Sequence, residues 1–145
     1  MEIVETQFPS STQTPLAVRA FLRAALSTWK LDGFGDVTEL LTDELVSNVV
    51  RHVNTPMTVR ALRQPAWIRV EVEDPSPTPP VIRRPEPFDD HGRGMLLVDG
   101  LASRWGTTVR DDGKTVWFEI DIATATEEIH GNTTDLPSGP RPLPT

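Results

Sequence analysis

The sequence contains no cysteine, and this one absence excludes three kinds of chemistry. Without thiols the chain cannot form disulfides, hold zinc through thiolates or attack a substrate with a cysteine nucleophile. A chain without cysteine also fits a reducing compartment, so we expect a cytoplasmic protein.

Long apolar runs are missing as well. The longest extend over only a few residues, as from Met95 to Val98, whereas a helix needs about 20 apolar residues to span a bilayer. The first residues, Met1 to Glu5, lack the basic segment that opens a secretory signal. We therefore expect a soluble chain that has no membrane partner.

Basic residues are few relative to acidic ones. The 14 Lys and Arg residues face 21 Asp and Glu residues, which gives a formal net charge of −7. Such a charge repels a nucleic-acid backbone, so no direct nucleic-acid partner is expected. The length of 145 residues suits one domain with a single two-layer core.

Hydrophobic periodicity predicts five strands and three helices. The strands are expected at 3–8, 57–63, 67–74, 104–110 and 115–122, and the helices at 15–29, 37–52 and 95–102. Thr14 and Asp36 are the predicted N-caps of the first two helices. This order lacks the regular alternation of a parallel doubly wound fold. It predicts an α+β fold, a two-layer sandwich with helices on one face of a mixed, mostly antiparallel sheet.

Two segments are expected to lie outside this regular structure. Residues 75–87 contain six prolines, which remove backbone donors and fix φ, so this stretch is predicted to be a loop. From about Thr124 the chain is rich in Thr, Glu, Gly and Pro with few apolar residues. We predict a domain over 1–123 and a disordered tail over 124–145.

One face of the predicted helix 37–52 carries polar side chains among apolar ones. Spacings of three and four residues bring together Val37, Leu41, Glu44, Asn48 and His52. An unpaired buried carboxylate is costly, so Glu44 needs a hydrated cation or a donor. The amide oxygen of Asn48 suits Mg²⁺, and Glu44 can accept a proton from a hydroxyl. A wide exposed helix face with a solvated Glu44 is the open alternative.

Two further features raise the same question. By period two, Asp74 lies on the inner face of the strand 67–74, where a carboxylate wants N–H donors such as the amine of adenine; a turn aspartate before Pro75 is the alternative. Gly92-Arg93-Gly94 opens a predicted helix and suits a phosphate, although an ordinary loop end has the same composition.

Other chemistries find little support. The three histidines, His52, His91 and His130, do not form an H-E-x-x-H motif, so a zinc site is not expected. No G-x-S-x-G elbow is present, and no Gly-Lys-Ser/Thr completes a Walker loop at Gly92-Arg93-Gly94.

Four segments in this order resemble the nucleotide-binding boxes of the GHKL ATPases. They are the stretch from Glu44 to His52, Val72-Glu73-Asp74-Pro75, Gly92-Arg93-Gly94-Met95 and Gly113-Lys114-Thr115. Within that superfamily the chain looks like the RsbW-type anti-sigma-factor serine kinases, especially the short stand-alone actinobacterial versions. The resemblance covers about residues 8–122.

The resemblance implies ATP and Mg²⁺ as ligands and assigns a role to each matched residue. Glu44 would be the general base, Asn48 the Mg²⁺ ligand and Asp74 the carboxylate that reads adenine, while Thr115 would support the adenine pocket beside Asp74. The further nucleotide-binding residues would be Arg51, His52, Gly92, Arg93, Gly94 and Met95, with the segment 75–91 as the ATP lid.

The resemblance also implies protein partners. Such proteins hold a sigma factor inactive and phosphorylate a serine on a STAS-domain antagonist. Arg19 and Arg23 lie in a region that the family uses for these partners, although a solvated helix face explains them equally well. Whether the chain forms a homodimer stays open.

Two departures from the family pattern favour keeping a second hypothesis. Asp74 is followed by Pro75-Ser76-Pro77 instead of glycines, and 89–91 reads Asp-Asp-His where better-known members have a basic residue. The alternative is a non-catalytic module that regulates a partner without phosphate transfer. A split histidine kinase is a third reading, disfavoured because no dimerising helix with an acceptor histidine precedes the domain.

Overall fold

The computed structural model describes residues 1–79 and 94–122, and the elements follow the predicted order. The strands are β1 (Glu2–Phe8), β2 (Met57–Gln64), β3 (Trp67–Asp74), β4 (Arg104–Arg110) and β5 (Gly113–Asp121). The helices are α1 (Thr14–Thr28), α2 (Gly35–Asn48) and α3 (Gly94–Leu101). Two short turns of helix flank α2: η1 (Asp32–Phe34), a 3₁₀ turn, and η2 (Val49–Val53), a π turn.

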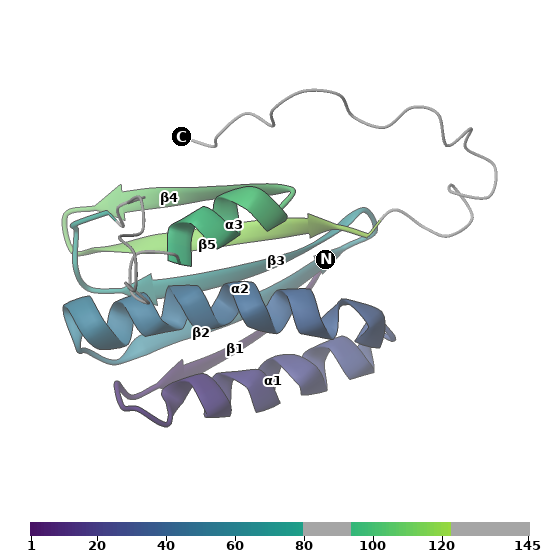
Figure 1. Ribbon diagram of the computed structural model, residues 1–145, viewed down its shortest axis with the longest axis horizontal. Coiled ribbons are helices and arrows are strands. Elements are labelled where there is room, and N and C mark those ends of the chain that lie inside the picture. Colours follow the sequence, from purple (N-terminus) through teal and green to yellow (C-terminus); the bar gives the residue numbers. More distant parts are fainter. Residues whose placement is uncertain (80–93, 123–145) are drawn as a thin grey trace, which may run out of the picture.

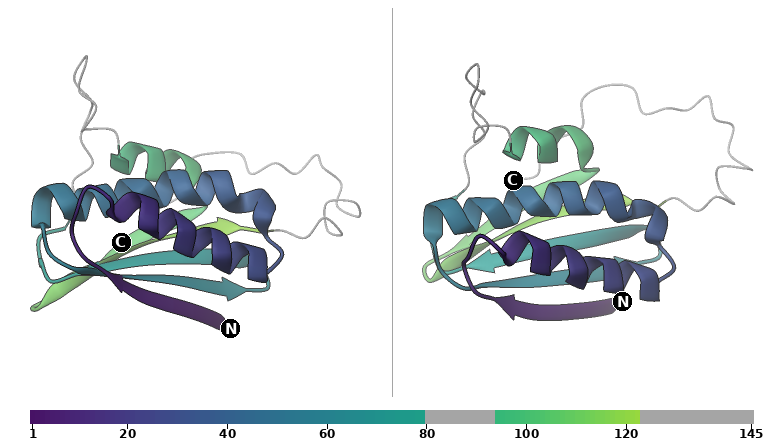
Figure 2. Two further views of the ribbon diagram at one scale, coloured as in Figure 1. Left: turned by 90° about the horizontal axis from the view of Figure 1, so that it is seen from below. Right: turned by 60° about the horizontal axis from the view of Figure 1, so that its bottom comes forward.

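The five strands form one sheet in the order β1-β2-β3-β5-β4. All four pairings between them are antiparallel. Figures 1 and 2 show the three helices together on one face of this sheet. The predicted α+β sandwich is therefore confirmed, but the described part of the sheet is antiparallel throughout rather than mixed.

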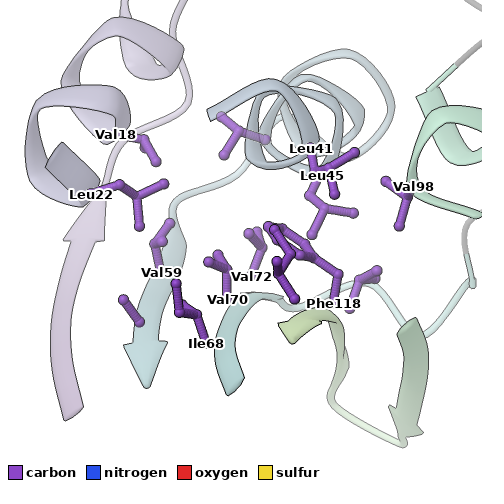
Figure 3. Packing of buried hydrophobic residues seen from close by; sticks show 14 of the residues in the cluster. Val18, Leu22, Leu41, Leu45, Val59, Ile68, Val70, Val72, Val98 and Phe118 are labelled. Carbon is purple, nitrogen blue, oxygen red and sulfur yellow. The ribbon is translucent and has the colours of Figure 1, made fainter. Parts of the chain in front are cut away.

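The core lies between the helices and the inner face of the sheet. Alternation along β3 turns Ile68, Val70 and Val72 inward, and all three are buried. They meet Leu41 of α2 and Phe118 of β5, both of which are fully buried (Figure 3). Each such side chain contributes about 1.5–3 kcal/mol on burial, so the central strands are firmly held.

Both predicted helix starts need correction. Helix α1 begins at Thr14 with Gln13 at the N-cap, and the Thr14 hydroxyl instead accepts a bond from the Ser11 N–H (3.0 Å) and donates to the Pro9 carbonyl. Helix α2 begins at Gly35, because the η1 turn runs directly into it and leaves no separate cap for Asp36.

Among the described residues, the outer face of the sheet carries charged side chains. The Cζ atom of Arg69 lies 5.7 Å from the ring centroid of Trp67 and 4.0 Å from that of Trp117. The Nε of Arg69 pairs with Oε2 of Glu119 at 2.9 Å. Gly106 lies beneath Trp117, where an added Cβ would come within 2.7 Å of the ring.

In the part of the chain that the structure describes, no helix combines the length and apolarity needed to cross a membrane.

Candidate functional site

Four secondary-structure elements begin or end at one end of the sandwich. In Figure 1 the last turns of α2, the end of β3 and the beginnings of α3 and β5 all lie on the left. The ends of α2 and β3 and the beginning of β5 carry residues of three of the four matched segments. The beginning of α3 carries Gly94 and Met95 of the fourth. The fold thus brings together four segments that lie far apart in the sequence.

Asp74 is a buried carboxylate at this end. Its side chain has an exposed fraction of 0%, and its Oδ1 accepts a hydrogen bond from the backbone N–H of Ser76 at 2.7 Å. The ammonium of Lys114, on β5, donates to the same Oδ1 at 3.1 Å. It also lies 3.0 Å from Oδ2, in an ion pair that lacks hydrogen-bond geometry, so Oδ2 accepts no hydrogen bond within the described residues.

The register of the sheet creates this contact. Asp74 pairs with Lys114 across β3 and β5, and paired residues in an antiparallel sheet project from the same face. Gly113, the residue before Lys114, comes so close to β3 that an added Cβ would lie 2.3 Å from the Asp74 carbonyl oxygen, and its φ is +154°. Glycine is therefore required where β5 begins.

Glu44 lies on α2 and is partly buried. Burial raises the pKa of this carboxyl above its ordinary value; the positive charge of Arg51 opposes the shift, and the negative charge of Asp43 adds to it. A carboxylate with a raised pKa accepts a proton more readily than an ordinary glutamate does. The environment of Glu44 therefore fits general-base chemistry.

Asn48, one helical turn after Glu44, is the last residue of α2. It is partly exposed, and its side chain makes no hydrogen bond with any other described residue, so its amide oxygen is available to a cation. Within 1–79 and 94–122, no cluster of three or more acidic or histidine side chains could hold a metal alone. The single amide oxygen of Asn48 therefore fits a Mg²⁺ ion that takes its other ligands from phosphates and water, which is how proteins commonly bind Mg²⁺.

The π turn that follows Asn48 changes the course of the helix. Asn54 ends the turn in the left-handed region (φ 55°), and its N–H donates to the Val49 carbonyl at 2.7 Å. Arg51 and His52 lie within this π turn, and both are exposed. That His52 shares the face of Glu44 and Asn48 stays a prediction.

Thr115 does not lie where the resemblance placed it. It pairs with Glu73, so its side chain projects from the outer face, and its hydroxyl accepts a bond from Arg110 at 3.1 Å. The β5 side chain that touches Asp74 is that of Lys114. The sequence contained the signal, because extending the inner row of Val116 and Phe118 back by two residues reaches Lys114.

The glycine-rich box is only partly described. Gly92 and Arg93 lie outside the described residues, as does most of the predicted lid over 75–91. Helix α3 begins at Gly94, as a phosphate-facing helix start requires. Met95 is 3% exposed and packs in the core, so its side chain anchors the helix and only its backbone can face a ligand.

Arg19 and Arg23 bridge α1 to α2. The Arg19 Nε donates to both carboxylate oxygens of Asp43 at 3.1 and 3.0 Å, while Arg23 pairs with Glu39 and lies 3.5 Å from Asp36. Both arginines are exposed and their heads are already matched by acidic side chains. A partner that uses them has to share or replace these carboxylates.

The sequence model of the family described as "Histidine kinase-like ATPase domain" matches residues 8–120. An uncharacterized protein of Streptomyces coelicolor is 40% identical over 81 residues, which cover 52% of this chain and 77% of that protein.

A solved structure shares the fold. The crystal structure of the RsbU and RsbW domains of a Mycobacterium tuberculosis protein superposes with a TM-score of 0.63 over 83% of this chain, at 18% sequence identity. The matched region makes up 32% of that solved chain, so the present chain spans about a third of its length.

Proposed function

The chain belongs to the family of histidine kinase-like ATPase domains, and on this premise we propose that it is an RsbW-type anti-sigma regulatory factor. In this proposal it binds ATP and Mg²⁺, sequesters a sigma factor and phosphorylates a serine on a STAS-domain antagonist. The fold shared with a chain that contains an RsbW domain supports the family-level part of the proposal. The proposed binding of ATP and Mg²⁺ and the proposed phosphate transfer are argued from the residues of the candidate site.

One observation carries the proposal: a buried carboxylate, Asp74, lies at the same end of the sandwich as the last turns of α2, which carry Glu44 and Asn48. Asp74 Oδ2 lacks a hydrogen-bond donor in the described chain, and the exocyclic amine of adenine would supply one. Asn48 would hold Mg²⁺, which offsets phosphate charge. The backbone at Gly92, Arg93 and Gly94 would face the phosphates.

The transfer step then follows from the chemistry of Glu44. The serine oxygen of the antagonist forms a bond to the γ-phosphorus, the bond between that phosphorus and the ADP oxygen breaks, and the serine proton passes to Glu44. The raised pKa of Glu44 supports this role, since it makes the carboxylate a better proton acceptor.

A second candidate function is a binding module without phosphate transfer. The observation that favours it is the ion pair between Lys114 and Asp74, which occupies the base-reading carboxylate, together with the prolines at 75 and 77 where the family has glycines. In such a module nucleotide would bind weakly or not at all.

Phosphate transfer from radiolabelled ATP separates the two functions. The chain would be purified with the STAS-domain protein that co-purifies with it from its own cells, and label on that protein would be measured with and without Mg²⁺. Label that appears only with Mg²⁺ and disappears in Glu44→Gln supports the kinase. Partner binding without any label, whether or not ATP is bound, favours the module.

A further inference from the structure

Lys114 is buried to a degree that is rare for lysine. Its side chain is 7% exposed, and lysines are seldom buried unless they are paired. Three oxygens surround its ammonium: Asp74 Oδ1 at 3.1 Å, Asp74 Oδ2 at 3.0 Å and the Ser76 carbonyl at 3.5 Å. The lysine therefore fills the place at Asp74 where an external N–H donor would bind.

This arrangement leaves the carboxylate inaccessible. The Asp74 side chain has no exposed surface, so a base cannot contact it while the lysine stays in place. Yet Oδ2 receives no hydrogen bond from any described residue, so the ion pair does not use the full acceptor capacity of Asp74. The lysine stem has four flexible carbons and can carry the ammonium away.

We propose that Lys114 is a specificity-determining residue that closes Asp74 in the free protein and has to withdraw before the amine of an adenine base can bind there. The inference rests on the proposed nucleotide site and adds a competition to it. A site that is open in only a minor fraction of molecules binds its ligand more weakly by that fraction. Nucleotide affinity is thus set partly by the lysine.

The first test removes the competing ammonium. Minor conformations are typically populated at up to about 10%, so Lys114→Met should bind ATP at least about tenfold more tightly than the unmodified chain in calorimetry. Lys114→Arg keeps a donor on Asp74 and should give no gain. Lys30→Met changes an exposed lysine on the surface and serves as the matched control.

The identity of the base shows whether Asp74 carries the gain. Inosine triphosphate has a carbonyl in place of the adenine amine, so Lys114→Met should not improve its binding. The double variant Asp74→Asn/Lys114→Met removes both charges and should lose the gain for ATP. A role of Lys114 in stability alone would affect both nucleotides equally.

A second measurement avoids substitution, because Lys114→Met leaves Asp74 without its counter-charge and could fail to fold. The chain has only two lysines, Lys30 and Lys114. Acetylation by a small amine-reactive reagent, quantified by peptide mass spectrometry relative to Lys30, should rise at Lys114 when ATP is added and stay low with inosine triphosphate.

The outcomes separate this inference from the proposed function. If the unmodified chain binds ATP and Asp74→Asn abolishes binding, but Lys114→Met brings no gain and acetylation of Lys114 does not rise, the inference is wrong and the nucleotide site stands. If neither the unmodified chain nor Lys114→Met binds ATP, both are wrong. Tighter binding of ATP alone by Lys114→Met supports the inference.

Discussion

At the scale of single residues, the carboxylate that gives Glu44 its proposed role also lowers the stability of the fold. Burial raises the pKa of its carboxyl in the folded chain above the value in the unfolded chain. Folding then favours the protonated form of the Glu44 carboxyl. The free energy of unfolding that this form contributes is fully present below the ordinary carboxyl pKa. It is lost as the pH rises through the pKa of Glu44 in the folded chain. At neutral pH the ionised Glu44 destabilises the fold.

Glu44→Gln should therefore raise the thermal unfolding temperature at pH 7. Near pH 4 it should have little effect, because Glu44 is then protonated in the folded chain and uncharged like the glutamine that replaces it. Glu2→Gln, at an exposed position in β1, is the matched control and should change neither value. Scanning calorimetry at both pH values measures the difference. A lower unfolding temperature for Glu44→Gln at pH 7 would show that the carboxylate is stabilising and that its environment is not as described.

Glu44→Gln should also separate binding from transfer. The amide has nearly the same shape but cannot take the serine proton, so phosphate transfer to the antagonist should fall by about 10²-fold or more, while ATP affinity changes little. Single-turnover assays and calorimetry on the same preparation provide both values. Equal losses in affinity and transfer would place Glu44 in nucleotide binding instead.

Gly113 is the residue whose substitution should damage the site through packing. An added methyl group would lie 2.3 Å from the Asp74 carbonyl oxygen. Overpacking and an unfavourable φ together should cost Gly113→Ala about 2 kcal/mol or more of unfolding free energy. Gly100→Ala in α3 meets no atom within 4 Å and should be neutral or stabilising by up to about 1 kcal/mol.

Urea denaturation of the two glycine variants decides the point. A Gly113→Ala protein that is as stable as the unmodified chain would contradict the close approach of β5 to Asp74.

At the scale of elements, the pairing of α1 with α2 is where a protein partner is expected. The ion pairs of Arg19 with Asp43 and of Arg23 with Glu39 are exposed, and such pairs contribute little to stability. Arg19→Ala should therefore leave the denaturation midpoint nearly unchanged while weakening capture of the sigma factor or antagonist. Arg104→Ala, on the opposite face, is the control.

A marked loss of stability in Arg19→Ala, with partner capture intact, would show that the pair joins the helices and has no part in recognition. Pull-down assays and denaturation curves on the same variants distinguish the two results.

The elements were easier to predict than their ends. Periodicity identified the five strands and three α-helices of the described chain because apolar spacing reflects the face that each element buries. The starts of α1 and α2 were misplaced because Thr14 bonds back to its own loop and η1 runs straight into α2. The π turn after Asn48 has no composition signal of its own, so it could not be predicted from spacing.

The site was partly predictable for a similar reason. Alternation along β3 placed Asp74 on the inner face, and the structure confirms that placement. Lys114 was missed because the β5 strand was predicted to start at Thr115, one residue too late to include it. Which residues meet across two strands depends on register, and register is set by the whole sheet.

At the scale of the whole molecule, one antiparallel sheet carries the proposed nucleotide site at one end, between its inner face and the helices. The three helices cover one face only, and the site forms where α2, β3, α3 and β5 reach that end (Figures 1 and 2). The central claim is that this end binds ATP through Asp74 and through a Mg²⁺ held by Asn48.

Calorimetric titration of ATP into the full chain, with and without Mg²⁺, tests this claim most directly. The account predicts one ATP per chain, affinity that depends on Mg²⁺ in the unmodified protein, and loss of that dependence in Asn48→Ala. Absence of ATP binding, or Mg²⁺-dependent binding that Asn48→Ala leaves unchanged, would contradict it.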